Sequence, residues 1–202
     1  MEALINAGGK GTRMGQCGTE KPMQEIGRKP VVRRVADALA GAKTVDRVLV
    51  SVSDHTPETE RYLRDSGIET VRTSGRDFVG DIHEAFESMN GTFVLTCPSD
   101  LPLVTSEAID GFAARFDDRM ESLIAVVPCS LLRGMGIKPS YTRQMNGAEW
   151  VLSGITIMDR EKTLRGEYLQ ELFYETDRRE FAVNVNTKEE LELARKLLEE
   201  DK

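Results

Sequence analysis

The sequence has few of the features that mark secreted, membrane or metal-stapled proteins. Its three cysteines, Cys17, Cys97 and Cys129, lie far apart and include no Cys-x-x-Cys pair. That spacing argues against both a disulfide framework and a zinc site. No apolar run approaches the roughly 20 residues that a membrane-spanning helix needs. The start of the sequence also shows no basic stretch followed by an apolar segment, the pattern that is typical of a signal peptide. We therefore expect a cytoplasmic protein with no membrane span.

Acidic residues outnumber basic ones overall, but basic residues are concentrated near the start of the chain. The 34 acidic and 27 basic residues give a net charge of −7, which argues against nonspecific binding to nucleic acid. Residues 1–34 nevertheless carry seven lysines and arginines against three glutamates. A basic segment in an acidic protein suits a small anionic ligand bound at one place. Four of these cations, Arg28, Lys29, Arg33 and Arg34, are expected on a solvated face.

A glycine-rich loop follows the first apolar segment. Residues 2–5 are typical of a short buried strand, and residues 6–15 then run Asn-Ala-Gly-Gly-Lys-Gly-Thr-Arg-Met-Gly. Glycines let backbone N–H groups crowd around an anion and allow a turn with positive φ. Lys10, Arg13 and Lys21 supply positive charge in the same segment. This combination predicts a polyphosphate site, and hence a protein that binds a nucleotide.

Two common phosphate-binding motifs do not fit this loop. A Walker A loop ends in Gly-Lys-Ser/Thr, whereas Lys10 is followed by Gly11. A dinucleotide fingerprint needs a third glycine for close packing of helix on strand, and Met14 stands at that position. A cofactor pyrophosphate would also need neither Arg13 nor Lys21. An enzyme that depends on NAD(P) is therefore a remote alternative.

Strand-like and helix-like segments alternate along the rest of the chain. Besides the opening strand, strands are expected over residues 46–53, 69–72, 92–97, 123–127, 150–158 and 181–185. Helices are expected after the N-cap Thr56, over residues 82–89, 106–116 and 167–173, and after the capping box from Thr187 to Glu190. Residues 129–149 show no clear period and are expected as an insertion over the active site. This alternation predicts a three-layer α/β fold with a mostly parallel sheet, in one domain over residues 1–202.

Three segments with polar side chains lie just past the ends of expected strands. They are the glycine loop, Asp100 after residues 92–97, and Asn186 after residues 181–185. In open α/β sheets, ligands bind beyond the carboxyl ends of the strands. We therefore expect these three segments to meet at one site.

The same segments resemble those of a known superfamily. Residues 7–15, Ala-Gly-Gly-Lys-Gly-Thr-Arg-Met-Gly, with Lys21-Pro22 downstream, resemble the signature of nucleotidyltransferases related to molybdenum-cofactor guanylyltransferase and sugar-phosphate nucleotidyltransferases. Residues 99–103, Ser-Asp-Leu-Pro-Leu, resemble its metal-binding aspartate segment, and residues 184–187, Asn-Val-Asn-Thr, a C-terminal segment of its molybdenum-cofactor branch. The opening residues, the compact length and residues 184–191 look most like the archaeal adenosylcobinamide-phosphate guanylyltransferases. The resemblance implies a Rossmann-like nucleotidyltransferase fold.

The resemblance also assigns catalytic roles. Arg13 would grip the phosphates and stabilise charge in the transition state, and Lys21 would bind the α-phosphate or the attacking phosphate. Asp100 would bind Mg²⁺, a hard cation that prefers oxygen ligands, with Asn186 as a second ligand. Asp100 could instead be a turn carboxylate before Pro102, and Asn186 a turn residue near a helix start.

Nucleotide and acceptor are expected to contact different residues. The nucleotide set joins the phosphate loop to the loop after the third strand: Ala7, Gly8, Gly9, Lys10, Gly11, Thr12, Arg13, Lys21, Ser74, Gly75 and Gly80. The acceptor set comprises Trp150, Ser153, Gly154 and Asn184. Trp150 is equally well explained as a half-buried residue at a strand start. Asp81, beside the second loop, is expected to cap a helix, with Glu84 three residues later.

The activity implied by the resemblance is transfer of GMP from GTP onto adenosylcobinamide phosphate, with release of pyrophosphate. Guanylyl transfer to molybdopterin, and cytidylyl or uridylyl transfer to a sugar or alcohol phosphate, are alternatives because sequence patterns define these pockets poorly. A rival of another class is a nucleotide-binding regulatory module, which would not need Arg13, Lys21 and Asp100 together. His55 and His83 have no partners in a triad or metal pattern. The oligomeric state is left open.

Overall fold

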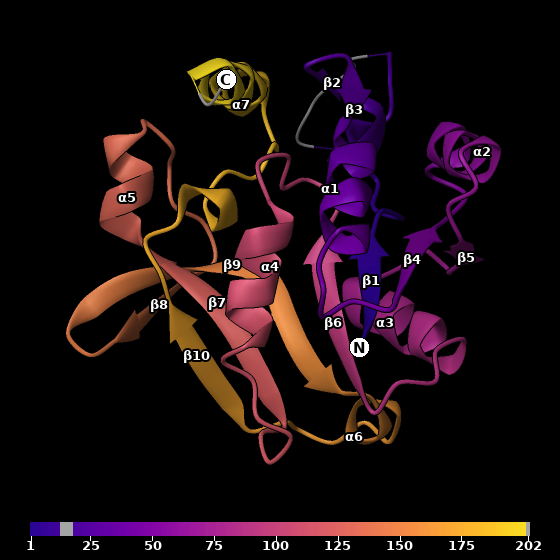
Figure 1. The fold of residues 1–202 in the computed structure, drawn as a ribbon. Coiled ribbons are helices and arrows are strands. Elements are labelled where there is room, and N and C mark those ends of the chain that lie inside the picture. The colour runs from indigo at the N-terminus through magenta and orange to yellow at the C-terminus, as the bar shows by residue number, and fades with distance from the viewer. Residues whose placement is uncertain (13–17, 201–202) are drawn as a thin grey trace.

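The computed structural model describes residues 1–12 and 18–200 and shows a broad β-sheet with helices on both faces (Figure 1). Within these residues, strands lie in the order β10, β7, β9, β6, β1, β4, β5, and β8 pairs with the start of β9. Their bounds are β1 Glu2–Asn6, β4 Arg47–Val52, β5 Thr70–Arg72, β6 Phe93–Pro98, β7 Ser122–Pro128, β8 Thr142–Met145, β9 Ala148–Asp159 and β10 Glu171–Glu175. A separate ribbon joins β2 Glu25–Ile26 to β3 Lys29–Pro30.

The sheet is mostly parallel, and its strand directions determine where the site lies. β1 runs parallel to both β4 and β6, β4 to β5, and β7 to β10. β9 runs antiparallel to its neighbours β6 and β7. The carboxyl ends of β1 and β6 therefore meet at one edge, drawn uppermost in Figure 1. The predicted α/β fold with a mostly parallel, Rossmann-like sheet is confirmed.

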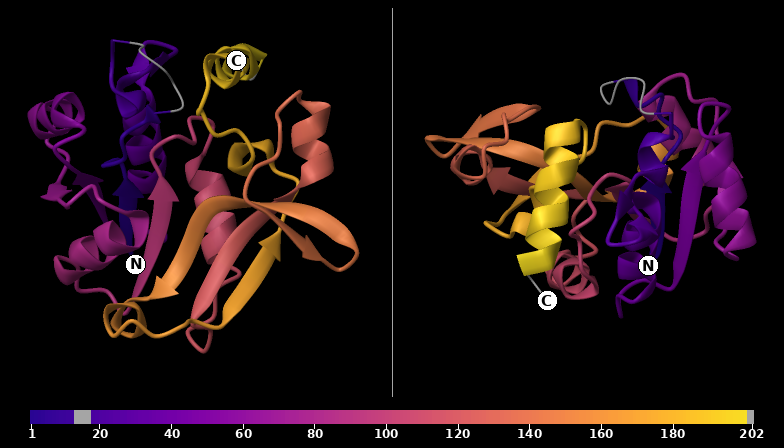
Figure 2. Two further views of the ribbon diagram at one scale, coloured as in Figure 1. Left: turned by 180° about the vertical axis from the view of Figure 1, so that it is seen from behind. Right: turned by 90° about the horizontal axis from the view of Figure 1, so that it is seen from above.

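Side chains that alternate along the central strands are buried on both faces of the sheet. Ala3 and Ile5 of β1 belong to the larger apolar cluster, whereas Leu4 belongs to a smaller one with Phe86. The larger cluster includes residues of α1 Val31–Ala40, α2 Pro57–Asp65, α4 Ser106–Ala113, α5 Cys129–Gly134 and α7 Lys188–Glu200. The smaller one lies under α3 Phe78–Glu87 and α6 Arg160–Leu164 (Figure 2). Helices on both faces give the three predicted layers.

Helix α1 was not predicted, although its sequence has a helical pattern. Val31, Val35 and Leu39 are buried on one face. On the other face Arg33 contacts Asp37 one turn later, with 2.6 Å between Arg33 Nε and Asp37 Oδ1. The run of valines is typical of a strand, but apolar positions spaced by three or four residues on one face favour a helix.

Two predicted elements near the C-terminus are wrong. Residues 167–173, expected as a helix, contain the start of the strand β10, because backbone pairing with β7 outweighs local helix preference. Residues 181–185, expected as a strand, are irregular after the 3-10 turn η3 Arg179–Phe181. Phe181 and Val185 are nevertheless buried, at 0% and 1% exposure. A short apolar run shows that a segment is buried but not which backbone conformation it adopts.

Residues 129–149 are more regular than expected. They contain α5 and the β8–β9 hairpin, whose turn at Asn146-Gly147 has φ of 50° and 76°. Asn-Gly favours this type of two-residue turn. The segment borders the expected site, because Leu132 and Tyr141 line a cavity at the carboxyl ends of the parallel strands.

Among the described residues, no helix is both long and apolar enough to cross a membrane. That residues 1–202 form one domain stays a prediction.

Candidate active site

The glycine loop leaves β1 at the central carboxyl edge of the sheet. Gly8 lies so close to the end of β4 that a Cβ atom there would stand 3.3 Å from the Ser53 Cβ. Gly11 has φ of +60°, a conformation that favours glycine. Glycine therefore suits the first position by close contact and the second by backbone conformation. Arg13 and Cys17 lie outside the described residues, so the predicted role of Arg13 stays a prediction.

Two adjoining cavities lie at this edge. The smaller, of about 240 Å³, is lined by the phosphate loop together with Lys21 and Asp100. The larger, of about 740 Å³, is lined by Gly8, the start of α3, and parts of α5 and β9. The predicted nucleotide-binding residues that line the smaller cavity are Ala7, Gly9, Lys10, Gly11, Thr12 and Lys21. The combined space has the size of a small-molecule site.

Lys21, Asp100, Asn184 and Asn186 meet beside this loop. Lys21 Nζ donates to Asp100 Oδ2 at 2.5 Å and to Asn186 Oδ1 at 2.8 Å. Asn184 Nδ2 donates to the other carboxylate oxygen, Asp100 Oδ1, at 2.9 Å. The side chains of Lys21 and Asp100 are 17% and 14% exposed, so water only partly screens their charges. Two predicted catalytic residues and both predicted metal ligands therefore share one cluster.

Backbone contacts and a helix cap hold this cluster together. Asp100 follows β6, and its carbonyl accepts a hydrogen bond from Val185 N at 2.8 Å, between the two asparagines. Glu190 Oε2 accepts from Asn186 N at 2.7 Å and from Thr187 N at 3.0 Å, and Glu190 N donates to Thr187 Oγ1 at 3.2 Å. This is the predicted capping box at the start of α7. Asn186 therefore lies on a well-anchored helix start.

The oxygen atoms around Lys21 fit a hard cation. The Lys21 ammonium bridges a carboxylate oxygen and an amide oxygen, so a positive charge already lies between ligand types that Mg²⁺ prefers. In the described part of the chain, no group of three His, Cys, Asp or Glu side chains could hold a metal. Asp100 and Asn186 would therefore need phosphate or water oxygens to complete the shell, which is common for Mg²⁺ in nucleotide enzymes.

The two cysteines that the structure describes are poorly suited to nucleophilic chemistry. Burial and the nearby Asp100 carboxylate raise the pKa of the Cys97 thiol far above its usual range. Burial and a contact with Glu149 also raise the pKa of Cys129. Thiols held in the protonated form are weak nucleophiles. A covalent cysteine mechanism is therefore unfavourable at both positions.

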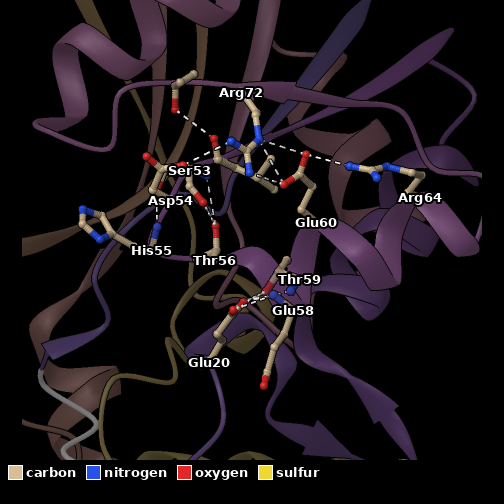
Figure 3. A network of polar contacts seen from close by, with 12 residues as sticks. Glu20, Ser53, Asp54, His55, Thr56, Glu58, Thr59, Glu60, Arg64 and Arg72 are labelled. Atoms are coloured by element: carbon tan, nitrogen blue, oxygen red, sulfur yellow. Dashed lines mark hydrogen bonds and ion pairs between the residues drawn. The ribbon is translucent and has the colours of Figure 1, made fainter.

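Glu20, next to Lys21, caps helix α2 from another segment of the chain. Its carboxylate accepts hydrogen bonds from Glu58 N at 2.7 Å, Thr59 N at 2.8 Å and Thr59 Oγ1 at 2.6 Å (Figure 3). Free N–H groups in a first helical turn favour such an anion. Thr56 is the N-cap residue of α2 and Pro57 its first residue, as predicted, but the Thr56 side chain makes no hydrogen bond to this helix start. Glu20 supplies the missing side-chain acceptor, and these bonds fix the backbone beside Lys21.

The loop after β5 borders the larger cavity with only part of its predicted nucleotide-binding set. Gly75 lines the cavity and has φ of +65°, a conformation that favours glycine. Ser74 N donates to Glu84 Oε2 at 2.6 Å, and Gly80 N donates to Asp77 Oδ1 at 2.8 Å. Ser74 and Gly80 therefore stabilise the loop and the helix start, while Gly75 borders the cavity.

Asp81 is not the predicted helix cap. Asp77 is the N-cap of α3, so the helix starts four residues earlier than expected and Asp81 lies in its first turn. Asp81 Oδ1 accepts from Gly75 N at 2.8 Å and from Ser74 Oγ at 3.1 Å. The prediction was wrong because both aspartates precede a plausible helix, and spacing alone did not separate them. Asp81 also lines the larger cavity.

Three of the four predicted acceptor residues, Ser153, Gly154 and Asn184, line the larger cavity. Gly154 has φ of +87° at an irregularity in the pairing of β9 with β7. Ser153 is 2% exposed, and its hydroxyl accepts a hydrogen bond from Ile155 N at 3.1 Å, so it shapes this bulge. Trp150 is half-buried near the start of β9 and outside the cavity lining, which agrees with its structural alternative.

Sequence patterns did not reveal Asn6, Glu20, Phe78 or Tyr141 as site residues. Asn6, Phe78 and Tyr141 line the larger cavity, and Glu20, the residue before Lys21, accepts hydrogen bonds from the start of α2. The one available signal was a polar residue, Asn6, directly after a buried strand. The others depend on contacts between distant segments.

Sequence comparisons agree with this geometry. Residues 3–144 match the family of MobA-like NTP transferase domains. The chain is 29% identical, over 212 aligned residues, to the adenosylcobinamide-phosphate guanylyltransferase of Methanocaldococcus jannaschii, with 100% of this chain and 99% of that protein covered. It is 29% identical over 126 residues to the "Probable molybdenum cofactor guanylyltransferase" of Pyrococcus horikoshii, with 62% of this chain and 60% of that protein covered.

Solved structures share the fold at low sequence identity. A CMP:2-keto-3-deoxy-manno-octonic acid synthetase complexed with CTP has a TM-score of 0.73 and 14% identity, covering 100% of this chain and 99% of that one. A nucleotidyl transferase from Methanothermobacter has a TM-score of 0.72 and 16% identity, covering 100% and 98%. Because the family match covers most of the sequence and includes the glycine loop and Asp100, this chain belongs to the MobA-like NTP transferase family.

Proposed function

We propose that this protein transfers GMP from GTP to the phosphate of adenosylcobinamide phosphate, forming adenosylcobinamide-GDP and pyrophosphate. Membership of the family supports the reaction type. The observation that carries the choice of base and acceptor is the end-to-end similarity to the guanylyltransferase of Methanocaldococcus jannaschii. The convergence of Lys21 and Asp100 beside the glycine loop favours catalysis over a binding module.

The reaction needs positioning and charge stabilisation more than it needs a protein base. An acceptor phosphate oxygen attacks the α-phosphorus of GTP while the bond from that phosphorus to pyrophosphate breaks. The attacking phosphate is already anionic near neutral pH, so no side chain must remove a proton. The barrier arises from bringing anions together and from negative charge that builds on pyrophosphate. Positioned cations and N–H groups lower such a barrier.

The cluster around Lys21 supplies groups of this kind. The Lys21 ammonium is held by two oxygen atoms, and phosphate oxygens can replace them without leaving the charge unpaired. Gly9, Lys10 and Gly11 line the adjoining cavity and would contact the triphosphate. Asp100 and Asn186 would hold Mg²⁺, which when bound would draw negative charge from the phosphate oxygens. Arg13, from the same loop, would add a second cation.

The side of the larger cavity formed by α5 and β9 fits an acceptor with an apolar body. Leu132, Ile137 and Val151 line it from α5, the loop after it and β9. Tyr141 also lines it, from the residue before β8, and is 72% exposed, although large apolar side chains are usually buried. A corrinoid would lie against these side chains while its phosphate reaches the cluster around Lys21. This part of the site is therefore the proposed acceptor pocket.

Asp81 is the proposed reader of the guanine edge. Asp81 lines the larger cavity, and its carboxylate already accepts a hydrogen bond from Gly75 N at 2.8 Å. Guanine presents two neighbouring donors, N1–H and N2–H₂, which one carboxylate can accept. Cytosine and uracil lack this pair, so the arrangement supports GTP as the donor.

A second candidate acceptor is molybdopterin. The relative from Pyrococcus horikoshii supports it, but that similarity covers 62% of this chain. Similarity to the corrinoid guanylyltransferase covers 100% and includes the segments that line the acceptor pocket. The longer match makes the corrinoid the preferred acceptor.

Pyrophosphate release tests this proposal. Purified protein is incubated with Mg²⁺ and GTP, ATP, CTP or UTP, with adenosylcobinamide phosphate, molybdopterin or no acceptor. We expect release only with GTP and the corrinoid. Release only with molybdopterin would move the protein to the second candidate, and release with CTP or UTP would overturn the guanylyl assignment. Asp100→Ala protein serves as the inactive control.

A further inference from the structure

Asn6, the last residue of the central strand β1, has an unusual side chain environment. Its Nδ2 and Oδ1 atoms are both buried, and neither has a hydrogen-bond partner in the described part of the chain. Buried amide groups almost always have partners, because loss of contact with water is otherwise uncompensated. Asn6 opens the glycine loop, but the loop pattern gives its side chain no role of its own. Its unpartnered amide indicates a ligand group that the protein itself does not supply.

The neighbouring strands explain why the amide has no protein partner. In the parallel register Asn6 lies between Ser51 of β4 and Pro98 of β6. Pro98 has no N–H group to donate. The Ser51 hydroxyl is directed to Ile5 O at 3.4 Å. Neither neighbour therefore satisfies the donor or the acceptor of Asn6.

The position of Asn6 identifies the part of the ligand that it meets. Asn6 lines both cavities, the smaller one with the glycine loop and the larger one with Gly75 and Asp81. Along β1 its side chain falls on the face of Leu4, which packs under α3. The smaller cavity suits the phosphates and the α3 side suits the base. The group between them in a nucleotide is the sugar.

We propose that the Asn6 amide binds a ribose hydroxyl and makes the site select ribonucleotides over deoxyribonucleotides. A hydroxyl both donates and accepts, so it can satisfy Oδ1 and Nδ2 together. A site built to bond a hydroxyl rejects an analogue without it, because its own polar atoms are then left unpartnered. This inference rests on the proposed nucleotidyltransferase function and adds the residue that reads the sugar.

The test compares affinities for GTP, 2′-deoxy-GTP and 3′-deoxy-GTP in wild type, Asn6→Leu and Thr96→Val. Leucine has nearly the shape of asparagine but forms no hydrogen bond. We expect wild type to bind GTP about 10-fold more tightly than at least one deoxy analogue. Asn6→Leu should bind GTP and that deoxy analogue with similar affinity, because its binding of GTP weakens. Thr96→Val, on the neighbouring strand β6 and outside the lining of both cavities, should keep the wild-type ratio.

Stability provides a second readout. Replacing an unpartnered amide by an apolar group should leave the melting temperature of Asn6→Leu without nucleotide equal to or above that of wild type. A wild-type ratio in Asn6→Leu, loss of the ratio in Thr96→Val, or no discrimination in wild type would overturn the inference. Absence of binding for every ribonucleoside triphosphate would overturn the proposed function as well, so the two failures are distinguishable.

Discussion

At the scale of the residue, Asp100 is the centre of the proposed chemistry, because Lys21 and Asn184 both contact its carboxylate. Asp100→Ala should reduce turnover by at least about 10²-fold, the order lost when one electrostatic partner of a transition state is removed. Pyrophosphate release at saturating GTP measures the effect, and circular dichroism checks the fold. Asp117→Ala is a matched control, since this aspartate pairs with the exposed Arg119. Normal turnover of Asp100→Ala would remove it from the mechanism.

Arg13 gives a prediction that rests on the sequence. Arg13→Ala should lower kcat by about 10²-fold if the guanidinium stabilises charge in the transition state. Steady-state kinetics with GTP distinguishes this role from simple binding. A change confined to KM would make Arg13 a binder of the ground state. Arg28→Ala, an exposed arginine of the same basic segment, should behave as wild type.

The sequence located the cluster at the residue scale but not the purpose of every member. Lys21 could be predicted from the basic segment and the family resemblance, and Asp100 and Asn186 from their motifs past expected strand ends, although residues 181–185 do not form the expected strand. Asp81 was misread as a cap because Asp77 offers the same local chemistry four residues earlier. Asn6 opens the glycine loop, but nothing in that pattern shows that its amide is buried without a hydrogen-bond partner.

At the scale of the element, Glu20 links the segment of Lys21 to the start of α2 (Figure 3). Glu20→Ala removes three hydrogen bonds and should lower the free energy of unfolding by about 1–2 kcal/mol, as loss of a helix cap does. It should also lower kcat, because the backbone beside Lys21 loses its anchor. Urea denaturation and steady-state kinetics measure the two effects. Glu58→Ala, a neighbouring exposed glutamate, should change neither, and equal effects in both variants would contradict the anchoring role.

Glu60 joins α2 to β5 and makes stability depend on pH. Arg72 donates to both carboxylate oxygens, with Arg72 Nη2 at 2.7 Å from Oε2, and Arg64 Nη2 lies 2.9 Å from Oε1. These contacts, chiefly the hydrogen bonds from Arg72, hold the pKa of the Glu60 carboxyl below its ordinary value of 4.5. Because the folded-state pKa is lowered, this stabilisation is present above the unfolded pKa and is lost as pH falls through the folded value.

Glu60→Gln should therefore flatten the pH dependence of stability. Between about pH 6 and about pH 3.5, wild type should lose more free energy of unfolding than the variant. Urea denaturation at several pH values measures the difference. Glu161→Gln, an exposed glutamate on α6, is the matched control and should follow wild type. The same pH profile in wild type and Glu60→Gln would show that the ion pair does not stabilise the folded state.

Most elements follow from local sequence, whereas the wrong ones depend on distant partners. The strands β4, β6 and β7 and the capped start of α7 could be predicted from β-branched runs and a capping box. The strand β10 forms only because β7 lies beside it. Residues 181–185 are buried beneath neighbouring segments without entering a ladder, which an apolar run alone does not distinguish from a strand.

At the scale of the whole molecule, the parallel strands bring the glycine loop and Asp100 to one edge, and the start of α7 adds Asn186 there. The alternation of segments predicted this convergence. The strand expected over residues 150–158 is present as β9, but its antiparallel course between β6 and β7, beside the proposed acceptor pocket, was not predicted. A strand's direction depends on the path of the chain between elements rather than on its own side chains.

Ligand binding should stabilise the whole fold selectively. GTP with Mg²⁺ should raise the melting temperature, since a ligand at about 100-fold its Kd adds about 2.7 kcal/mol to the unfolding free energy. NADH should leave the melting temperature unchanged. Thermal denaturation with each ligand makes the comparison. Stabilisation by NADH alone would revive the dinucleotide alternative.

The most direct test of the central claim follows the phosphorus atoms themselves. GTP labelled with radioactive phosphorus at either the α- or the γ-position is incubated with the protein, Mg²⁺ and adenosylcobinamide phosphate, and the products are separated. Transfer of GMP predicts that the α-label enters the corrinoid and the γ-label leaves in pyrophosphate. A corrinoid that stays unlabelled by α-labelled GTP, or that takes the γ-label, would contradict the assignment.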